Sequence, residues 1–213
     1  MISDIIATLI GNYMTTCFVL GLLVAGVVIA RHRGHRSGAV VSGILLNMFI
    51  LFAVGVAQAI NFVMHSFFGD FAARTIGWAQ SPFQLELAFA SLGFAVIAFV
   101  VHGRRAQFRG KVALVLATAV TGFGAAGGHI YQMAVNADFA VNNTGLLLVM
   151  DILIPTFALA LILWHALARG GEASPTDART VHVPGPRRGS ADVTGDARTG
   201  RAGRAGAAPG EIP

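Results

Sequence analysis

One stretch governs how this sequence is interpreted: GFGAAGGHIYQ, residues 122–132. Small residues, a histidine and a glutamine here interrupt a run that is otherwise apolar enough to be buried in lipid. Polar groups in hydrocarbon are costly and are generally retained because they have a partner or a function. The stretch therefore marks a place where function is expected, although it identifies no reaction.

The composition is that of a membrane protein rather than a soluble domain. The 213-residue chain is 55% hydrophobic and 12% charged, whereas charged residues make up about 25% of soluble domains. Its mean hydropathy is +0.69, so a lipid bilayer is its expected partner. The net charge of +5 does not indicate nucleic acid, because the basic residues lie between apolar runs and in a polar tail rather than on one folded face. Cys17 is the single cysteine, which excludes an intrachain disulfide and a cysteine-based zinc site.

Five apolar runs are each long enough to cross a bilayer, which requires about 20 helical residues. They predict an all-α fold, an integral membrane five-helix bundle over residues 1–168, with spans at about 4–30, 39–68, 82–101, 112–134 and 146–168. The third span has a start signal, because Ser81 is a favoured N-cap, Pro82 suits the first helical position and Gln84 suits a capping box. Residues 169–213 are poor in large apolar side chains, so they are predicted to form a disordered tail.

The distribution of Lys and Arg predicts the orientation of the bundle. The connections after the first and third spans carry three and four of these residues, the segment from Arg169 onward carries seven, and the connection between the second and third spans carries one. Because positive charge marks the cytoplasmic side of a membrane protein, we expect the N-terminus outside and the tail in the cytoplasm.

Three ionisable residues from three spans are predicted to share one depth. At about 1.5 Å per helical residue, Glu86 lies roughly 6 Å from the outer end of its span, and His129 and Asp151 lie roughly 8 Å from theirs. Because a bundle in lipid turns its polar faces inward, these side chains are expected to form a cavity in the outer third, open to the outside. Second-rank candidates for the same layer are Asn61, His65 and Gln132.

The two acids also have purely structural interpretations. Glu86 can complement the positive N-terminal end of its helix, or extend its carboxylate to the membrane surface. Asp151 precedes Pro155 by four residues, and this proline removes the hydrogen bond to the carbonyl of residue 151. Such a kink either builds a site beside the carboxylate or only bends the helix.

The histidine in the opening stretch has a structural interpretation as well. His129 can be a packed residue bonded to a neighbouring helix. Gly124 and Gly128, which precede it, have the spacing that lets membrane helices approach closely. Close approach would also place His129 against a neighbour that carries an acid, so the two interpretations are compatible.

The chemistry of the predicted layer stays open at this point. Histidine with carboxylate suits a transition metal and equally suits proton transfer, while His65 and His129 together could hold a haem. The function is therefore binding or transport of a small ligand, proton or cation, or that of a redox subunit with metal, haem or quinone. A third hypothesis is an accessory subunit in a homo-oligomer or larger membrane complex. The sequence contains no nucleophile elbow, P-loop or dinucleotide fingerprint that would identify an enzyme.

Part of the chain resembles a known family. The resemblance is carried by Ile76-Gly77-Trp78, Ser81-Pro82-Phe83-Gln84 with Glu86, Gly128-His129-Ile130-Tyr131-Gln132, Asn143, Gly145, Asp151-Ile152 and Pro155. Over about residues 75–168 the chain resembles a family of small, functionally uncharacterised prokaryotic multi-pass membrane proteins. The resemblance implies a helical protein of a bacterial inner or plasma membrane, and it implies no substrate, cofactor or catalytic residue.

Overall fold

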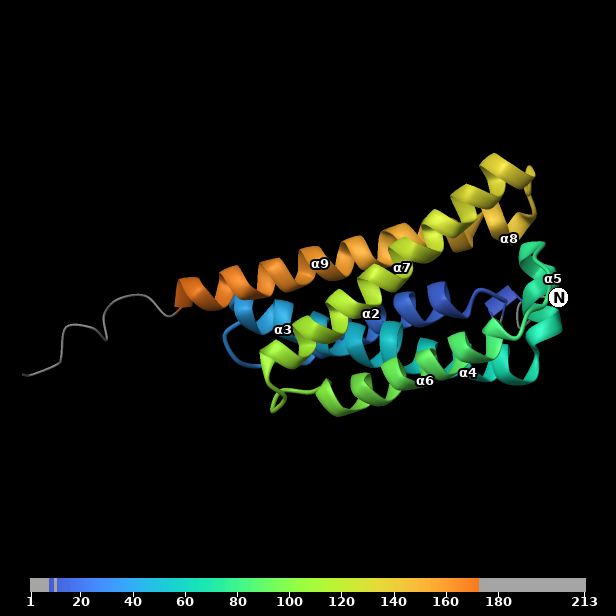
Figure 1. Cartoon of the computed structure of the whole chain (residues 1–213). Helices are drawn as coiled ribbons and strands as arrows, with labels where there is room; N and C mark the ends of the chain where they lie inside the picture. Colours follow the sequence, from blue (N-terminus) through green and yellow to red (C-terminus); the bar gives the residue numbers. More distant parts are fainter. Residues whose placement is uncertain (1–7, 10, 173–213) are drawn as a thin grey trace, which may run out of the picture. The chain divides into compact units, whose positions relative to one another are not determined.

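Helices make up every long element of the structure, a computed structural model that describes residues 8, 9 and 11–172 (Figure 1). The five long helical segments are α2 (Tyr13–Arg31), the segment Gly38–Phe67, α6 (Phe83–Val101), α7 (Phe108–Asn136) and α9 (Leu146–Glu172). Two short helices, α5 (Gly69–Ile76) and α8 (Val141–Thr144), lie in the connections. All five long segments are long and apolar enough to cross a membrane, so the prediction of five such helices is confirmed.

The ends of three helices differ from the predicted spans. α2 begins at Tyr13, after a turn at Asn12, whereas the first span was predicted to begin near residue 4. α7 extends beyond 112–134 in both directions, from Phe108 to Asn136. α9 continues to Glu172, so residues 169–172, which we assigned to the tail, are helical. The guanidinium of Arg169 lies 5.5 Å from the ring centre of Phe108, a contact that favours helix over disorder at this position. The remainder of the predicted tail, 173–213, and the first residues of the first predicted span lie outside the described residues.

The long helices turn large apolar side chains outward and small ones inward. Leu23, Val100 and Val120 are 63%, 73% and 73% exposed. Alanines and a serine occupy the buried face of α6: Ala88, Ser91, Ala95 and Ala98. Helices in lipid associate through small residues, because there is no hydrophobic gain from burying large ones. The distribution therefore suits contact with hydrocarbon rather than with water.

An aromatic cluster forms the centre of the core. The ring centroids of Phe18 on α2 and Phe157 on α9 lie 5.2 Å apart in an edge-to-face arrangement. Phe49 completes the cluster, with its centroid 6.2 Å from that of Phe18. At Gly21, one turn from Phe18, an added Cβ would lie 3.2 Å from the backbone O of Met48, so the glycine allows α2 to approach the second long segment.

The second long segment contains a π-helical stretch that the sequence did not predict. It consists of α3 (Gly38–Met48), the π-helix η1 (Phe49–Val56) and α4 (Ala57–Phe67). Within η1, an added Cβ at Gly55 would lie 3.0 Å from Phe99 Cε1 and 3.4 Å from the Cβ of Ala98, so α6 packs closely there. Such stretches insert a wider turn without breaking the helix, and here the wider turn coincides with the contact to α6.

Packing between α7 and α9 is closest at Gly122. An added Cβ there would lie 3.3 Å from the nearest backbone oxygen of α9 and 3.3 Å from Cγ of Pro155. An added Cβ at Gly124 would have no atom within 4 Å, and one at Gly128 would make an ordinary 3.6 Å contact with Trp78. The prediction that Gly124 and Gly128 form the close-packing pair is therefore wrong, because neither of them faces α9 at the crossing.

The start of α6 uses only part of the predicted capping signal. Ser81 Oγ accepts a hydrogen bond from the backbone N–H of Phe83 at 3.2 Å. The side chain of Gln84 does not return to the cap; it donates to His65 Nδ1 at 2.9 Å and to the backbone O of Gly69 at 3.0 Å. The predicted capping box is therefore wrong, because Gln84 faces α4 and satisfies polar groups there.

Candidate functional site

His129 and Asp151 meet between α7 and α9. His129 Nε2 lies 3.5 Å from Asp151 Oδ2, and only 4% of His129 and 5% of Asp151 are exposed. Both residues lie within helices that are apolar enough to cross a membrane. The structure thus brings together two of the three residues that the sequence placed at one depth.

Asn143 on α8 joins this pair and is completely buried. Its Oδ1 lies 2.7 Å from His129 Nδ1. Its amide nitrogen donates to the backbone O of Asp138 at 2.8 Å and to the backbone O of His129 at 3.4 Å. Sequence reasoning did not select Asn143 as a site residue, because an asparagine in a connection between helices is typical of turns and caps.

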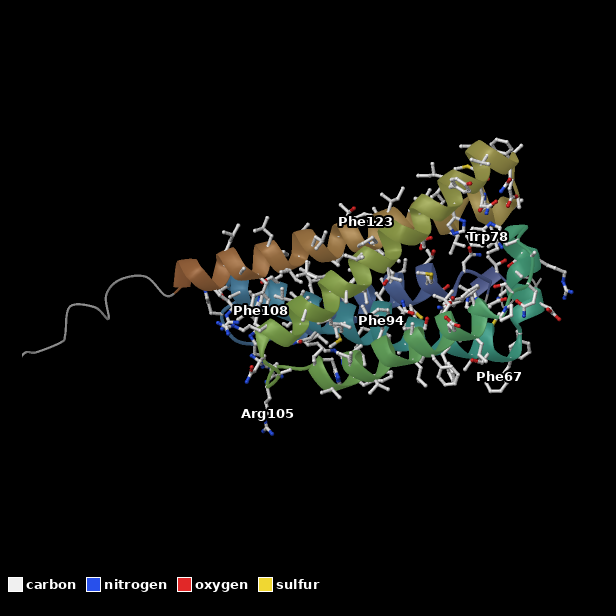
Figure 2. All side chains as sticks on the ribbon, viewed as in Figure 1. Phe67, Trp78, Phe94, Arg105, Phe108 and Phe123 are labelled. Atoms are coloured by element: carbon white, nitrogen blue, oxygen red, sulfur yellow. The ribbon has the colours of Figure 1, made fainter. Side chains whose placement is uncertain are left out.

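The hydrogen bond from Trp78 to Asn143 shows which nitrogen of His129 carries a hydrogen. The indole Nε1 can only donate, and it donates to Asn143 Oδ1 at 3.2 Å. The atom that faces His129 Nδ1 is therefore an acceptor, so Nδ1 is the donor in that contact. In a neutral imidazole Nε2 is then an acceptor without a hydrogen. Figure 2 shows Trp78 beside α8 and the adjoining end of α7, where its ring packs on that of His129 at a centroid distance of 5.2 Å.

A proton shared by His129 and Asp151 would make their contact attractive. Their contact is attractive in two forms: a neutral carboxylic acid that donates to Nε2, or an imidazolium that faces a carboxylate. Without the shared proton, the lone pair of Nε2 faces a charged oxygen, and two acceptors oppose each other. The geometry is therefore suited to holding one proton between Nε2 and Oδ2.

The end of α5 positions Trp78. Gly77 adopts a φ of +80°, which ends α5, and the backbone N–H of Trp78 donates to the backbone O of Ala73 at 3.0 Å. An added Cβ at Gly77 would lie 2.8 Å from Asp138 Oδ1. Glycine is therefore needed both for the left-handed backbone and for the close contact with Asp138.

A second group of polar side chains extends the layer across the bundle. Asn61 on α4 donates through Nδ2 to Ser91 Oγ on α6 at 2.7 Å, and its Oδ1 accepts from the hydroxyl of Tyr13 at the start of α2. The sequence could have indicated Tyr13, because this polar residue lies nine positions inside the first predicted span, at about the depth of Asn61, which lies seven positions inside the second.

The other predicted residues lie apart from His129 and Asp151. His65 Nδ1 accepts from Gln84, which joins α4 to α6. Gln132 Oε1 accepts from Asn136, one turn further along α7. Glu86 is exposed, on the side of α6 opposite its buried face. The predicted depth of Glu86 therefore does not bring it to the pair, because its side chain points outward.

The donor set does not suit a metal ion or a haem at His129. Both ring nitrogens of His129 already face protein partners, Asn143 and Asp151, and Nδ1 of His65 is bonded to Gln84. Nowhere in residues 8, 9 and 11–172 do three or more His, Cys, Asp or Glu side chains gather to hold a metal ion. The arrangement suits hydrogen bonding and proton exchange instead.

These observations define a class: a helical bundle with an apolar surface, five helices able to cross a membrane, and a buried polar layer. The chain belongs to a family of unknown function, DUF6790, whose family model matches residues 11–171. The match covers α2 and nearly all of α9, and so includes the complete polar layer. No curated protein and no solved structure matches the chain.

Proposed function

We propose that this chain is a multi-pass membrane protein that binds and releases a proton at its outer side through His129 and Asp151. One observation carries the proposal: Nε2 of His129 faces Asp151 Oδ2 at 3.5 Å inside an apolar bundle, while Nδ1 is held by Asn143. A histidine and a carboxylate that share one proton in low-dielectric surroundings form a proton-binding unit.

Loss of the proton has a structural consequence in this proposal. When the pH rises enough to remove the shared proton, His129 Nε2 and the carboxylate of Asp151 become opposed acceptors. The contact between α7 and α9 then weakens, and the ring of Trp78, which packs on His129, changes its surroundings. Proton release is thereby coupled to a change at the outer end of the bundle.

Tryptophan fluorescence tests this coupling. Trp78 and Trp164 are the two tryptophans of the chain, so a Trp164→Phe background leaves Trp78 as the sole emitter. In that background we expect one pH-dependent transition in the emission of purified protein, with a shift to longer wavelength at high pH as Trp78 becomes hydrated. Asp151→Asn should remove the transition, because an amide N–H donates to Nε2 without needing a shared proton.

A matched control and the opposing outcomes make the test decisive. Asp70→Asn also neutralises one acid, on α5 close to Trp78 in sequence, but Asp70 is exposed and does not contact His129. It should leave the transition in place. An identical transition in the Asp151→Asn variant, or no transition in the Trp164→Phe protein, would show that the pair does not exchange a proton.

The same proposal predicts that the protein transports protons. Reconstituted in liposomes, the protein should conduct protons or couple them to a solute, and Asp151→Asn should lower the flux by at least about tenfold if the shared proton is on the route. Flux that is equal in the two proteins would restrict the pair to a structural role.

A second candidate function is that of a subunit that packs beside another membrane protein. Glu86 favours it, because this acid is exposed on the outward side of α6 between Leu85 and Leu87, which are 51% and 43% exposed. A carboxylate that faces hydrocarbon is costly, and a polar or basic group on a neighbouring protein would offset the cost. Glu86→Leu should then reduce the amount of a larger complex seen by native electrophoresis of mild detergent extracts; an unchanged complex would contradict it.

A further inference from the structure

A basic cleft opens at the end of the bundle away from His129 and Asp151. Its volume is about 430 Å³, and α3, α7, α9 and the connection between α6 and α7 line it. Its polar lining residues are Asn47, Arg104, Gln107, Lys111, His165 and Arg169. Figure 2 shows Phe108, which also lines the cleft, at the end of α7 near α3 and α9.

Lys111 is the most buried charge in this cleft. Only 7% of it is exposed, and its Nζ donates to Asn47 Oδ1 and, at 2.7 Å, to the backbone O of Gly103. Both partners are neutral, whereas an ammonium group carries three donors and a full charge. A buried cation held only by neutral acceptors remains electrostatically uncompensated.

Four acidic residues, Asp70, Glu86, Asp138 and Asp151, are far from Lys111 along the bundle. Asp70 and Asp138 lie in the connections at the opposite end (Figure 1). Asp151 precedes Arg169 by eighteen residues on α9, which is about 27 Å of helix. Glu86 precedes the end of α6 by fifteen residues, or about 22 Å. These four acids therefore cannot neutralise the cleft.

The aromatic and histidine side chains fix the wall formed by α9. Ser42 Oγ donates to the backbone O of Gly38 at 2.7 Å and lies 2.8 Å from His165 Nδ1, so the ring nitrogen is the donor in that contact. The Phe108 ring packs on His165 at a centroid distance of 5.2 Å, and the Arg169 guanidinium lies 5.5 Å from the same ring. His165 and Arg169 therefore line the same cleft as Lys111 in fixed positions.

We propose that this cleft binds a phosphate group of net negative charge, with Lys111, Arg104 and Arg169 as its cationic contacts. Guanidinium groups bind phosphate oxygens through paired hydrogen bonds, and a buried ammonium adds a point charge. Basic pockets between helices at the predicted cytoplasmic side of a bundle suit lipid headgroups, and a soluble phosphate offers the same chemistry. The proposal is independent of proton exchange at His129 and Asp151.

Two double variants of the full chain test the proposal. Arg104→Ala with Arg169→Ala removes two exposed cations that line the cleft. Arg105→Ala with Arg109→Ala removes the same charge from exposed positions that do not line it; Figure 2 shows Arg105 pointing away from the helices. Lys111 stays in place in both variants, so the buried contacts to Asn47 and Gly103 remain intact.

The probes distinguish the two sources of phosphate. Delipidated protein in detergent is titrated with phosphatidylglycerol, with phosphatidylcholine and with inorganic phosphate, and binding is followed by native mass spectrometry and by thermal stability. We expect phosphatidylglycerol, inorganic phosphate or both to bind the wild type, more tightly than phosphatidylcholine. Removing the cleft arginines should weaken that binding by at least about tenfold, and removing Arg105 and Arg109 should change it by less than about twofold.

Each result decides the matter. Binding of phosphatidylglycerol alone assigns the cleft to a lipid headgroup, and binding of inorganic phosphate assigns it to a soluble anion. Equal losses in the two double variants would show only diffuse attraction between charges. Equal losses in the two variants would therefore overturn the proposal. It would also be overturned if phosphatidylcholine bound as tightly as phosphatidylglycerol, or if neither anionic probe bound.

Discussion

At the scale of single residues, the site depends on one asparagine that contacts two other side chains and the backbone. Asn143 accepts from Trp78, faces His129 Nδ1 and donates to the backbone O of Asp138. It thereby orients the imidazole so that Nε2 faces Asp151. The sequence predicted the depth of His129 and Asp151, because depth follows from counting residues along a helix. It did not predict Asn143, whose role depends on how the connection after α7 folds back over the bundle.

Replacing Asn143 should destabilise the protein, whereas replacing its neighbour should not. Asn143→Ala leaves the indole N–H of Trp78 and the Nδ1–H of His129 without acceptors, and each buried unpaired donor costs about 1–3 kcal/mol. We expect a loss of about 2–5 kcal/mol in the free energy of unfolding. Asn142→Ala removes an asparagine that makes none of these contacts. Thermal unfolding of both variants in the same detergent measures the difference, and equal melting temperatures would contradict the role of Asn143.

Glu86 shows why depth alone does not define a site. A residue count placed it level with the other two ionisable residues, but the direction of its side chain depends on which face of α6 is buried. That face consists of small residues, Ala88, Ser91, Ala95 and Ala98, and Glu86 is on the opposite side at 100° per residue. The pattern was visible in the sequence, since close-packed faces of membrane helices are rich in small residues.

At the scale of helices, hydropathy was sufficient to predict the elements but not their detailed geometry. The five runs stand out because each is apolar over the thickness of a bilayer. The π-helical stretch Phe49–Val56 could not be predicted, because its residues are apolar on all sides and leave no periodic pattern to reveal a change in helical pitch. The close approach of α7 and α9 at Gly122 also depends on the crossing geometry, which several glycines of α7 could have satisfied.

The crossing of α7 and α9 should tolerate a large side chain at Gly124 but not at Gly122. Gly122→Leu forces α9 away at Pro155, with an overpacking cost of about 1–3 kcal/mol. Gly124 is exposed and an added Cβ meets no atom within 4 Å, so Gly124→Leu should be neutral or stabilising by up to about 1 kcal/mol. The two melting temperatures measure this. If the two substitutions behave alike, Gly122 is not the point of closest approach.

The same pair of variants should also differ at the polar site. Gly122 lies close to the backbone of Asp151, so a displaced α9 would move the carboxylate away from His129. In the Trp164→Phe background, the pH-dependent emission of Trp78 should therefore be lost in Gly122→Leu and retained in Gly124→Leu. If both variants retain the pH-dependent emission, the packing at Gly122 does not control the contact between His129 and Asp151.

At the scale of the whole bundle, the two ends carry opposite chemistry. The end with α5 and α8 holds His129, Asp151 and Asp138, whereas the other end holds the basic cleft with Lys111 and Arg169. Among the described residues, Arg74 is the one Lys or Arg at the first of these ends. A bilayer imposes such an asymmetry, because positive charge is retained in the cytoplasm. We therefore expect the proposed proton site to face outside and the proposed phosphate site to face the cytoplasm, where phosphorylated solutes and anionic headgroups are available.

Labelling from one side of the membrane tests this orientation. In a Cys17→Ser background, a cysteine at Phe139, which is 69% exposed in the connection between α7 and α8, should react with a membrane-impermeant maleimide in intact spheroplasts. A cysteine at Arg105, exposed in the connection between α6 and α7, should react only after the membrane is permeabilised. The reverse pattern would place His129 and Asp151 on the cytoplasmic side, and reaction at both positions in intact spheroplasts would contradict a bundle that crosses the membrane. The expected pattern follows from the charge asymmetry alone, because moving the basic connections across the bilayer would be far more costly than moving the nearly uncharged ones.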